Sequence, residues 1–192
     1  MERYLRREIP LEALDRWLSE HVQALASSAR QTGLLMAATP LGFFRSADGG
    51  ERWTQVSRGL GDLEARRVEF LPTDDNVLFA TSLGGLFRSA DQGRTWTRCG
   101  AGLPHADIMG LALHPDGRTI YASDFTWGGV FRSTDGGESW QRLTADGLIS
   151  DRVWTLAVDP TAPERVLAAS PIGGVHLLLP PPAAGAADGS SH

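Results

Sequence analysis

The chain has 192 residues, of which 42% are hydrophobic and 21% charged, as is usual for a globular domain with one core. Its net charge of −5 gives no electrostatic reason to bind nucleic acid or an anionic membrane. The single cysteine, Cys99, excludes an internal disulfide, and no apolar run approaches the roughly 20 residues of a membrane-spanning helix. We therefore expect no nucleic-acid partner, no membrane span and a cytoplasmic location.

The N-terminal segment, residues 1–20, supports two interpretations. Leucines at three- and four-residue steps follow Pro10, which is well placed in a first helical turn, and predict a helix over about 10–20. The residues Glu2-Arg3-Tyr4 match Glu51-Arg52-Trp53 further along the chain, which predicts a strand over 2–8. Both interpretations stay open at this point.

The next segment introduces a repeat. Apolar runs at 22–25 and 34–37 precede GFFRSADGGERW at 42–53, which recurs as GLFRSADQGRTW at 85–96 and GVFRSTDGGESW at 129–140. Asp48 and Asp91 are 43 residues apart, and Asp91 and Asp135 are 44 apart. A period of this length is typical of a solenoid, an array or a propeller.

Each unit is composed in the same order. An alternating apolar segment, a polar turn and a short apolar run precede a Gly-Gly pair and the Phe-Arg-Ser strand, and a Trp-centred strand ends the unit. Four short strands separated by such turns predict one antiparallel sheet per unit. The four expected units cover about 21–60, 65–103, 107–148 and 151–179, and together they make a repeat domain over 21–179. A disordered tail is expected at 180–192.

The fourth unit is incomplete. It ends in Gly173-Gly174-Val175-His176-Leu177, without the Asp motif and without an outermost strand, so a strand at 2–8 could complete it and close a ring. The fold class that follows is all-β, a small propeller of about four four-stranded antiparallel blades with a short N-terminal helix. A closed ring, an open arc and one half of a dimeric ring all remain open.

The recurring Ser-x-Asp-x-Gly-x-x-Trp motif is either a reactive site or a structural fastener. The Asp can accept backbone hydrogen bonds across a turn, the Gly permits a positive φ, and the Trp buries a large ring. Each part thus has a structural use, which favours the fastener. The motif residues are Ser46, Asp48, Gly50, Trp53, Ser89, Asp91, Gly93, Trp96, Ser133, Asp135, Gly137 and Trp140.

These three copies resemble the Asp-box, or BNR, repeat of the WD40/YVTN/BNR-like propeller superfamily over about residues 20–178. The chain is similar to photosystem II assembly factors of the Ycf48/HCF136 type and to sialidase-type propellers. The resemblance implies that the box lies in the hairpin between the third and fourth strands of a blade, away from a catalytic face. Since these families include enzymes, receptors and assembly factors, the motif indicates fold rather than function.

A search for catalytic chemistry gives no candidate set. Sialidase-type catalysis, as the resemblance implies, needs a Tyr nucleophile, and the two tyrosines here are Tyr4 and Tyr121, the latter in an apolar run. Paired carboxylates could come from loops at Asp107, Asp124 and Asp151, although loop carboxylates are usually only solvated. The histidines form no spaced ligand pair, so we expect no catalytic residue, no metal and no cofactor.

The loops opposite the box are the better candidates for binding. The stretch Asp124-Phe125-Thr126-Trp127 is longer than its counterpart Ser82-Leu83, and its aromatic residues could anchor a partner or plug a ring centre. Repeated arginines at 45, 88 and 132 could form a basic stripe, but packing or pairing within the blades is the simpler interpretation. The candidate binding residues are Asp124, Phe125, Trp127, Arg66, Arg67, His105, Asp107, Asp151 and Arg152.

Two functions follow as expectations. The first is a non-enzymatic binding or assembly scaffold of the BNR-repeat propeller type that binds a protein partner. The alternative is a glycan-binding or glycoside-hydrolase-like propeller. A homodimer is a further expectation, because an incomplete ring could be completed by a second copy.

Overall fold

The computed structural model describes residues 8–10, 22–60, 64–103, 107–143 and 152–179, and these form strands joined by turns, without a helix. The strands make four antiparallel sheets. In the first sheet the strands are β1 (Glu8–Pro10), β2 (Ala24–Ser27), β3 (Leu35–Thr39), β4 (Gly42–Ser46) and β5 (Arg52–Gln55). In the second they are β6 (Ala65–Leu71), β7 (Asp74–Ser82), β8 (Gly85–Ser89) and β9 (Thr97–Cys99).

The other two sheets follow the same order. The third holds β10 (Ile108–Leu113), β11 (Ile120–Asp124), β12 (Val130–Ser133) and β13 (Gln141–Leu143), and the fourth holds β14 (Thr155–Val158), β15 (Val166–Ser170) and β16 (Gly174–Leu178). Consecutive strands pair with each other in every sheet, as in a meander, except that β1 pairs with β5. The expected strand order of the units is therefore confirmed.

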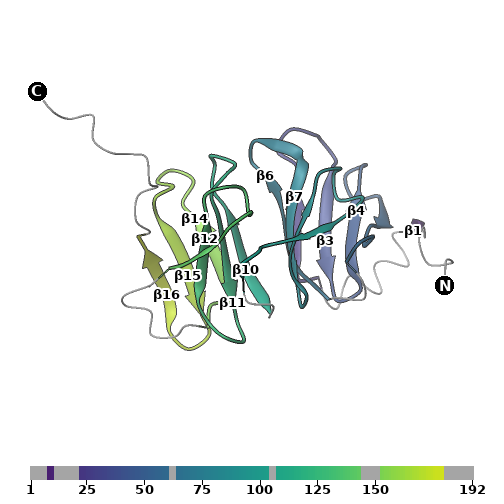
Figure 1. Cartoon of the computed structure of the whole chain (residues 1–192). Coiled ribbons are helices and arrows are strands. Elements are labelled where there is room, and N and C mark those ends of the chain that lie inside the picture. The colour runs from purple at the N-terminus through teal and green to yellow at the C-terminus, as the bar shows by residue number, and fades with distance from the viewer. Residues whose placement is uncertain (1–7, 11–21, 61–63, 104–106, 144–151, 180–192) are drawn as a thin grey trace, which may run out of the picture.

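The four sheets stand side by side in chain order, and the first and fourth lie at opposite ends of the row (Figure 1). The all-β architecture of small antiparallel blades is confirmed, and a single chain forms an open row rather than a closed ring. Whether two chains share one ring stays a prediction.

The N-terminal strand differs from the expectation. Residues 8–10 form β1, which pairs with β5 through Ile9 opposite Trp53, so the strand extends the first sheet instead of completing the fourth. The physical reason is sequence separation: pairing Glu8–Pro10 with β5 closes a shorter stretch of chain than pairing with β16 would, and so costs less closure entropy. Pro10 ends this strand rather than starting a helix, and the rest of the expected 10–20 helix and of the 2–8 strand lies outside the described residues.

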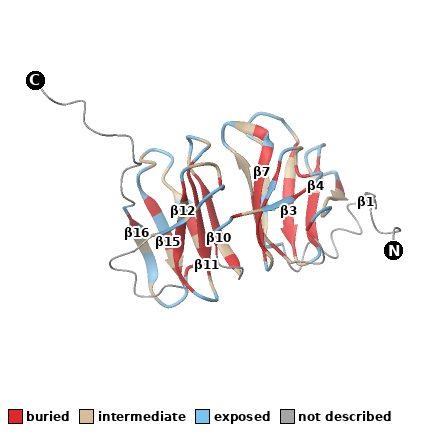
Figure 2. Ribbon diagram, viewed as in Figure 1, coloured by how far each residue is buried: buried red, intermediate tan, exposed pale blue. Residues whose placement is uncertain are grey.

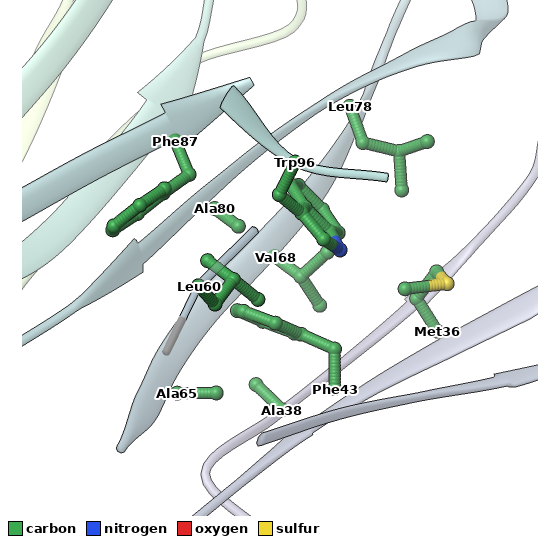
Figure 3. Packing of buried hydrophobic residues seen from close by; sticks show 10 residues of the cluster. All are labelled: Met36, Ala38, Phe43, Leu60, Ala65, Val68, Leu78, Ala80, Phe87 and Trp96. Carbon is green, nitrogen blue, oxygen red and sulfur yellow. The ribbon is translucent and has the colours of Figure 1, made fainter. Parts of the chain in front are cut away.

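Most of the hydrophobic core lies at the boundaries between neighbouring sheets (Figure 2), and a small fourth cluster of Ala37, Phe44 and Trp53 lies within the first sheet. Figure 3 shows the boundary of the first two sheets, where Phe43 stacks on Trp96 with ring centres 4.9 Å apart. Sheets two and three enclose a second cluster with Phe79, Ile108 and Phe131. A third cluster, which includes Tyr121 and Val166, joins sheets three and four.

The inner strand β7 has an almost continuously apolar sequence because both of its faces are buried. Leu78 and Ala80 face the first sheet, while Val77 and Phe79 face the third, so both faces are buried. One boundary differs from the expectation: the sequence predicts a turn over 72–76, but β7 already begins at Asp74 and leaves a tight turn at Pro72-Thr73.

The fourth sheet has three strands among the described residues, as the incomplete fourth unit predicts. Its inward residues Leu156, Val166 and Ala168 are buried against sheet three, whereas Val175 and Leu177 on its outer face are exposed. Within the described ranges no helix could span a membrane.

Candidate functional site

The three Asp boxes form the same hydrogen-bonded turn. In the third box the Ser133 hydroxyl donates to Asp135 (2.7 Å) and accepts from the Gly137 N–H (2.8 Å), and Asp135 accepts from the N–H groups of Glu138 and Ser139 (both 3.0 Å). Matching bonds link Ser46, Asp48, Gly50 and Arg52, and Ser89, Asp91, Gly93 and Thr95. Each turn lies between the third and fourth strands of its repeat unit, as the resemblance implies.

These turns stabilise the ionised carboxylates. The Ser139 hydroxyl, together with the Ser139 amide, holds the pKa of Asp135 well below its usual range. The Arg52 amide, followed by the Ser46 hydroxyl, lowers the pKa of Asp48 in the same way. A carboxylate whose lone pairs are already occupied by its own turn is a poor general acid or base. The box therefore acts as a fastener.

The box tryptophans differ in which carbonyl accepts their indole N–H. The indole N–H groups of Trp53 and Trp140 donate to Gly50 and Gly137 in their own turns, at 3.0 and 3.1 Å. The Trp96 indole instead donates to the Val56 carbonyl of the preceding unit at 2.8 Å. Trp96 thus ties the second sheet to the first, beyond closing its own turn.

At the opposite end of β12, the β11–β12 loop is held by Asp124. This residue ends β11, is 0% exposed, and accepts the Trp127 N–H with Oδ1 at 2.7 Å. Its Oδ2 is buried and has no hydrogen-bond partner within the described part of the chain. A buried carboxylate oxygen without a donor is costly unless a ligand, a proton or an opposite charge satisfies it.

Asp107 lies beside this loop end. Its carbonyl accepts the Phe125 N–H at 3.0 Å, and its carboxylate is 3.7 Å from the Arg66 guanidinium, which also pairs with Glu64 at 3.3 Å. Burial raises the pKa of Asp107; the charge of Arg66 opposes this shift, and those of Asp124 and Glu64 add to it. At this loop end, Asp107 thus interacts electrostatically with Asp124 and Glu64, and Arg66 is the cation between Asp107 and Glu64.

Aromatic side chains surround this cluster. Phe125 lies 6.0 Å from Trp154, ring centre to ring centre, and the Arg152 guanidinium lies 5.7 Å from the Phe125 ring centre. Trp127 is 76% exposed and Trp154 49% exposed. An exposed Trp127 is available as a surface anchor, and whether it anchors a partner or plugs the centre of a ring completed by a second chain stays a prediction.

The structure brings together most of the candidate residues from sequence. Arg66, Asp107, Asp124, Phe125 and Arg152 meet at one loop end, with Trp127 on the surface above. Arg67 does not join this group, since its guanidinium donates to the Met109 carbonyl at 3.4 Å. His105 and Asp151 lie outside the described residues. We define the loop-end cluster as Arg66, Asp107, Asp124, Phe125, Trp127, Arg152 and Trp154.

Sequence reasoning missed Trp154 and Glu64. Trp154 lies just before β14, and a two-residue alternation counted from the buried Leu156 would have placed it inward, so the sequence pattern carries no signal for its exposure. Glu64 precedes β6 as Asp107 precedes β10, and its carbonyl accepts the Leu83 N–H as Asp107 accepts that of Phe125. The internal repeat could therefore have revealed Glu64.

The remaining chemical candidates are structural. Tyr121 is buried in the core, and burial raises the pKa of its hydroxyl although the charge of Arg132 opposes the shift, which does not suit a nucleophile. Burial raises the pKa of the Cys99 thiol to about 12. No group of three metal-ligating side chains exists in the described ranges. Arg45 donates to the Gln92 side chain at 3.0 Å, so it pairs within the row of blades but not with a carboxylate.

Comparisons with known proteins agree with this architecture. The model of the BNR/Asp-box repeat matches residues 131–142, the third box. A comparison with curated protein sequences gives no match. The chain thus carries three Asp-box turns on successive antiparallel sheets, and its sheets have the strand order of β-propeller blades.

Several solved structures have a similar fold. The fold is similar to an ancestral GH74 enzyme (TM-score 0.71, 21% identity) and to the Niastella koreensis GH74 enzyme (0.66, 20%), over 83% of this chain and 23% and 28% of theirs. It is also similar to YCF48 bound to a D1 peptide (0.53, 14%), over 83% of this chain and 54% of that one. The chain thus spans about a quarter to a half of these proteins, and the likeness is one of fold.

Proposed function

We propose that the chain is a non-enzymatic binding scaffold that holds a protein partner at the loop-end cluster. The observation that carries the proposal is the pair of tryptophans at 76% and 49% exposure above a charged cluster whose Asp124 is buried. Exposed aromatic side chains on a rigid support are the usual anchors of a protein interface. The Asp124 carboxylate supplies that support by accepting the Trp127 N–H.

A comparison of the four sheets supports the same assignment. The equivalent loops of the other sheets are held by hydroxyl groups of Thr39, Ser82 and Ser170, which accept N–H groups two residues further on. Only the third sheet uses a carboxylate, followed by a longer loop that carries Trp127. A hydroxyl suffices to close these turns, so the extra charge and the extra tryptophan serve something other than folding.

The experiment is affinity capture with purified chain followed by mass spectrometry. Leu83→Ala is the matched control, because Leu83 is an exposed apolar residue in the equivalent loop of the second sheet. We expect a protein that is enriched by the wild type and by Leu83→Ala but lost with Trp127→Ala. If Trp127→Ala captures the same proteins as the wild type, the loop-end cluster is not the interface.

The alternative is a glycan-binding or glycoside-hydrolase-like function. The observation in its favour is the coupling of Asp107 with Asp124 at one loop end, where burial raises the pKa of Asp107. Aryl glycosides test it. Hydrolysis that disappears in Asp107→Asn and Asp124→Asn would establish the enzyme and overturn the scaffold, whereas no hydrolysis by the wild type would leave the scaffold standing.

A further inference from the structure

The residue after the box Asp differs among the three copies while its backbone does not. Gly49, Gln92 and Gly136 have φ values of 81°, 60° and 79°. Their N–H groups donate to the carbonyls of Gly33, Asn76 and Arg118 at 3.0, 2.9 and 2.9 Å. The three positions are therefore equivalent, and the only difference is the side chain.

At the boundary between sheets one and two, that side chain fills the space between blades. The Arg45 guanidinium donates to Gln92 Oε1 at 3.0 Å, and Gln92 Nε2 donates to Gln31 and Asn76, both at 3.2 Å. Burial, followed by the charge of Arg94, lowers the pKa of Arg45. The arginine of this boundary is thus engaged inside the protein.

At the boundary between sheets two and three the same space is empty. A Cβ added at Gly136 would meet nothing within 4 Å. A cavity of about 690 Å³ opens here, with an apolar floor of Leu71, Val77 and Phe79. Arg88, the counterpart of Arg45, lines it and is exposed, and within the described residues its guanidinium makes no hydrogen bond or ion pair.

The polar groups around this cavity define what it can bind. Asp135 is occupied by its own turn, and the N–H groups of Gly136 and Gly137 donate to Arg118 and Ser133. Arg98 also lines the cavity and is already engaged within the protein. The Arg88 guanidinium remains, a planar fork of donors that matches a carboxylate. The exposed Glu138 carboxylate on the rim disfavours a second negative charge on the ligand.

We propose that the cavity between sheets two and three binds a monocarboxylate carried on an apolar group, with the carboxylate on Arg88 and the apolar group on Leu71, Val77 and Phe79. Its volume is within the range of about 300–1,000 Å³ found for small-molecule sites. This site is separate from the loop-end cluster, and it does not depend on the proposed function.

The test is an NMR titration with phenylacetate, followed through the amide signals of Gly136 and Gly137, with phenylacetamide as the uncharged probe of the same shape. We expect saturable shifts with phenylacetate at these two residues and at least tenfold weaker binding of phenylacetamide. Arg88→Gln removes the charge-assisted bonds and should weaken phenylacetate binding about ten- to a hundredfold. Equal binding of both probes, or no saturable shift, would overturn the proposal.

A second pair of variants tests the cavity itself. Gly136→Gln places in the third box the side chain that Gln92 carries at a similar φ in the second, and should abolish phenylacetate binding. Gly49→Gln imposes the same backbone strain in the first box, where a Cβ also meets nothing within 4 Å, and should bind like the wild type. Wild-type affinity in a folded Gly136→Gln would contradict the proposal; if that variant does not fold, Arg88→Gln decides.

An acetylated Ala-Ala-Phe peptide with a free carboxyl end distinguishes the two sources of such a ligand. Binding at least tenfold tighter than that of phenylacetate, and lost on amidation, would identify a peptide C-terminus as the ligand. Binding weaker than that of phenylacetate would identify a free small acid. In both cases the carboxylate site stands, and its loss in Arg88→Gln is the common control.

Discussion

The carboxylates at the two ends of the third sheet differ in their hydrogen bonding. At the Asp-box end, Asp135 accepts hydrogen bonds from Ser133, Glu138 and Ser139 within its own turn. At the loop end, Asp124 Oδ2 is buried without a hydrogen-bond partner among the described residues. The first arrangement recurs in three sheets, and the second occurs in one.

This difference indicates which positions of a repeat protein are available for binding. Positions that are identical in every copy satisfy their own hydrogen bonds and hold the hairpins together. Positions that differ have surface, space or hydrogen-bonding capacity that the fold does not use. Trp127 is exposed, the space beside Gly136 is unfilled, and one oxygen of the Asp124 carboxylate has no donor among the described residues.

Trp96→Ala should cause the largest loss of stability. Trp96 is 4% exposed, stacks on Phe43 and donates to Val56, so its removal opens a cavity between two sheets. We expect the free energy of unfolding in urea to fall by about 3–5 kcal/mol. Trp140→Ala should cost less, because Trp140 is only partly buried and bonds within its own turn. Equal losses would show that Trp96 does not join the sheets.

Ser133→Ala should have the next largest effect. It leaves the buried Gly137 N–H without its acceptor and removes the donor to Asp135, which should cost about 1–3 kcal/mol. Ser46→Ala and Ser89→Ala should cost similar amounts, since their bonds are the same. The exposed neighbour Thr134→Ala serves as the control. A box whose serine can be removed without loss is not a fastener.

Glu69 makes the stability depend on pH. It lies on β6 where the equivalent residues of β10 and β14 are Ala112 and Ala157, and burial raises its pKa to about 7 while the Leu113 amide opposes the shift. The folded state then holds the proton more tightly than the unfolded chain, so stability should fall as pH rises from about 4.5 to 7.

Glu69→Gln should remove that dependence. We expect the variant to be more stable than the wild type by about 1–2 kcal/mol at pH 8 and to differ little at pH 4, measured by urea unfolding. Parallel pH curves for the two proteins would mean that Glu69 is solvated in the folded state.

Asp124→Ser should change stability least. It gives the third sheet the hydroxyl that closes the equivalent turn in the second, where Ser82 accepts the Gly84 N–H. We expect the melting temperature to stay within a few degrees of the wild type, because the turn keeps an acceptor and a buried charge is lost. Capture of the partner should nevertheless be lost. A large fall in melting temperature would make Asp124 a structural residue.

The sequence predicted the repeated part of this molecule well, because its physical signals are local. Alternating apolar residues and Gly-rich turns located the strands of sheets two to four, and the box residues located the hairpins. Most of the loop-end cluster could also be anticipated, since a repeat places Asp107 and Asp124 at the same end of a sheet as Arg66.

The features that sequence did not predict depend on packing between sheets. The pairing of β1 with β5 depends on which sheet edge lies within reach of residues 8–10. The burial of Asp124 depends on a neighbouring strand, although a loop carboxylate is usually solvated. The cavity at Gly136 becomes apparent only when Gln92 is seen to fill the equivalent space.

In the proposed function, the identical positions fasten the sheets and the differing positions recognise the partner. Its most direct test is partner capture by Ser133→Ala and Asp124→Ser, side by side, at a temperature at which near-ultraviolet circular dichroism shows both folded. We predict that Ser133→Ala, although less stable, captures the partner like the wild type, and that Asp124→Ser, although as stable as the wild type, does not. Capture by Asp124→Ser together with loss in folded Ser133→Ala would contradict the account.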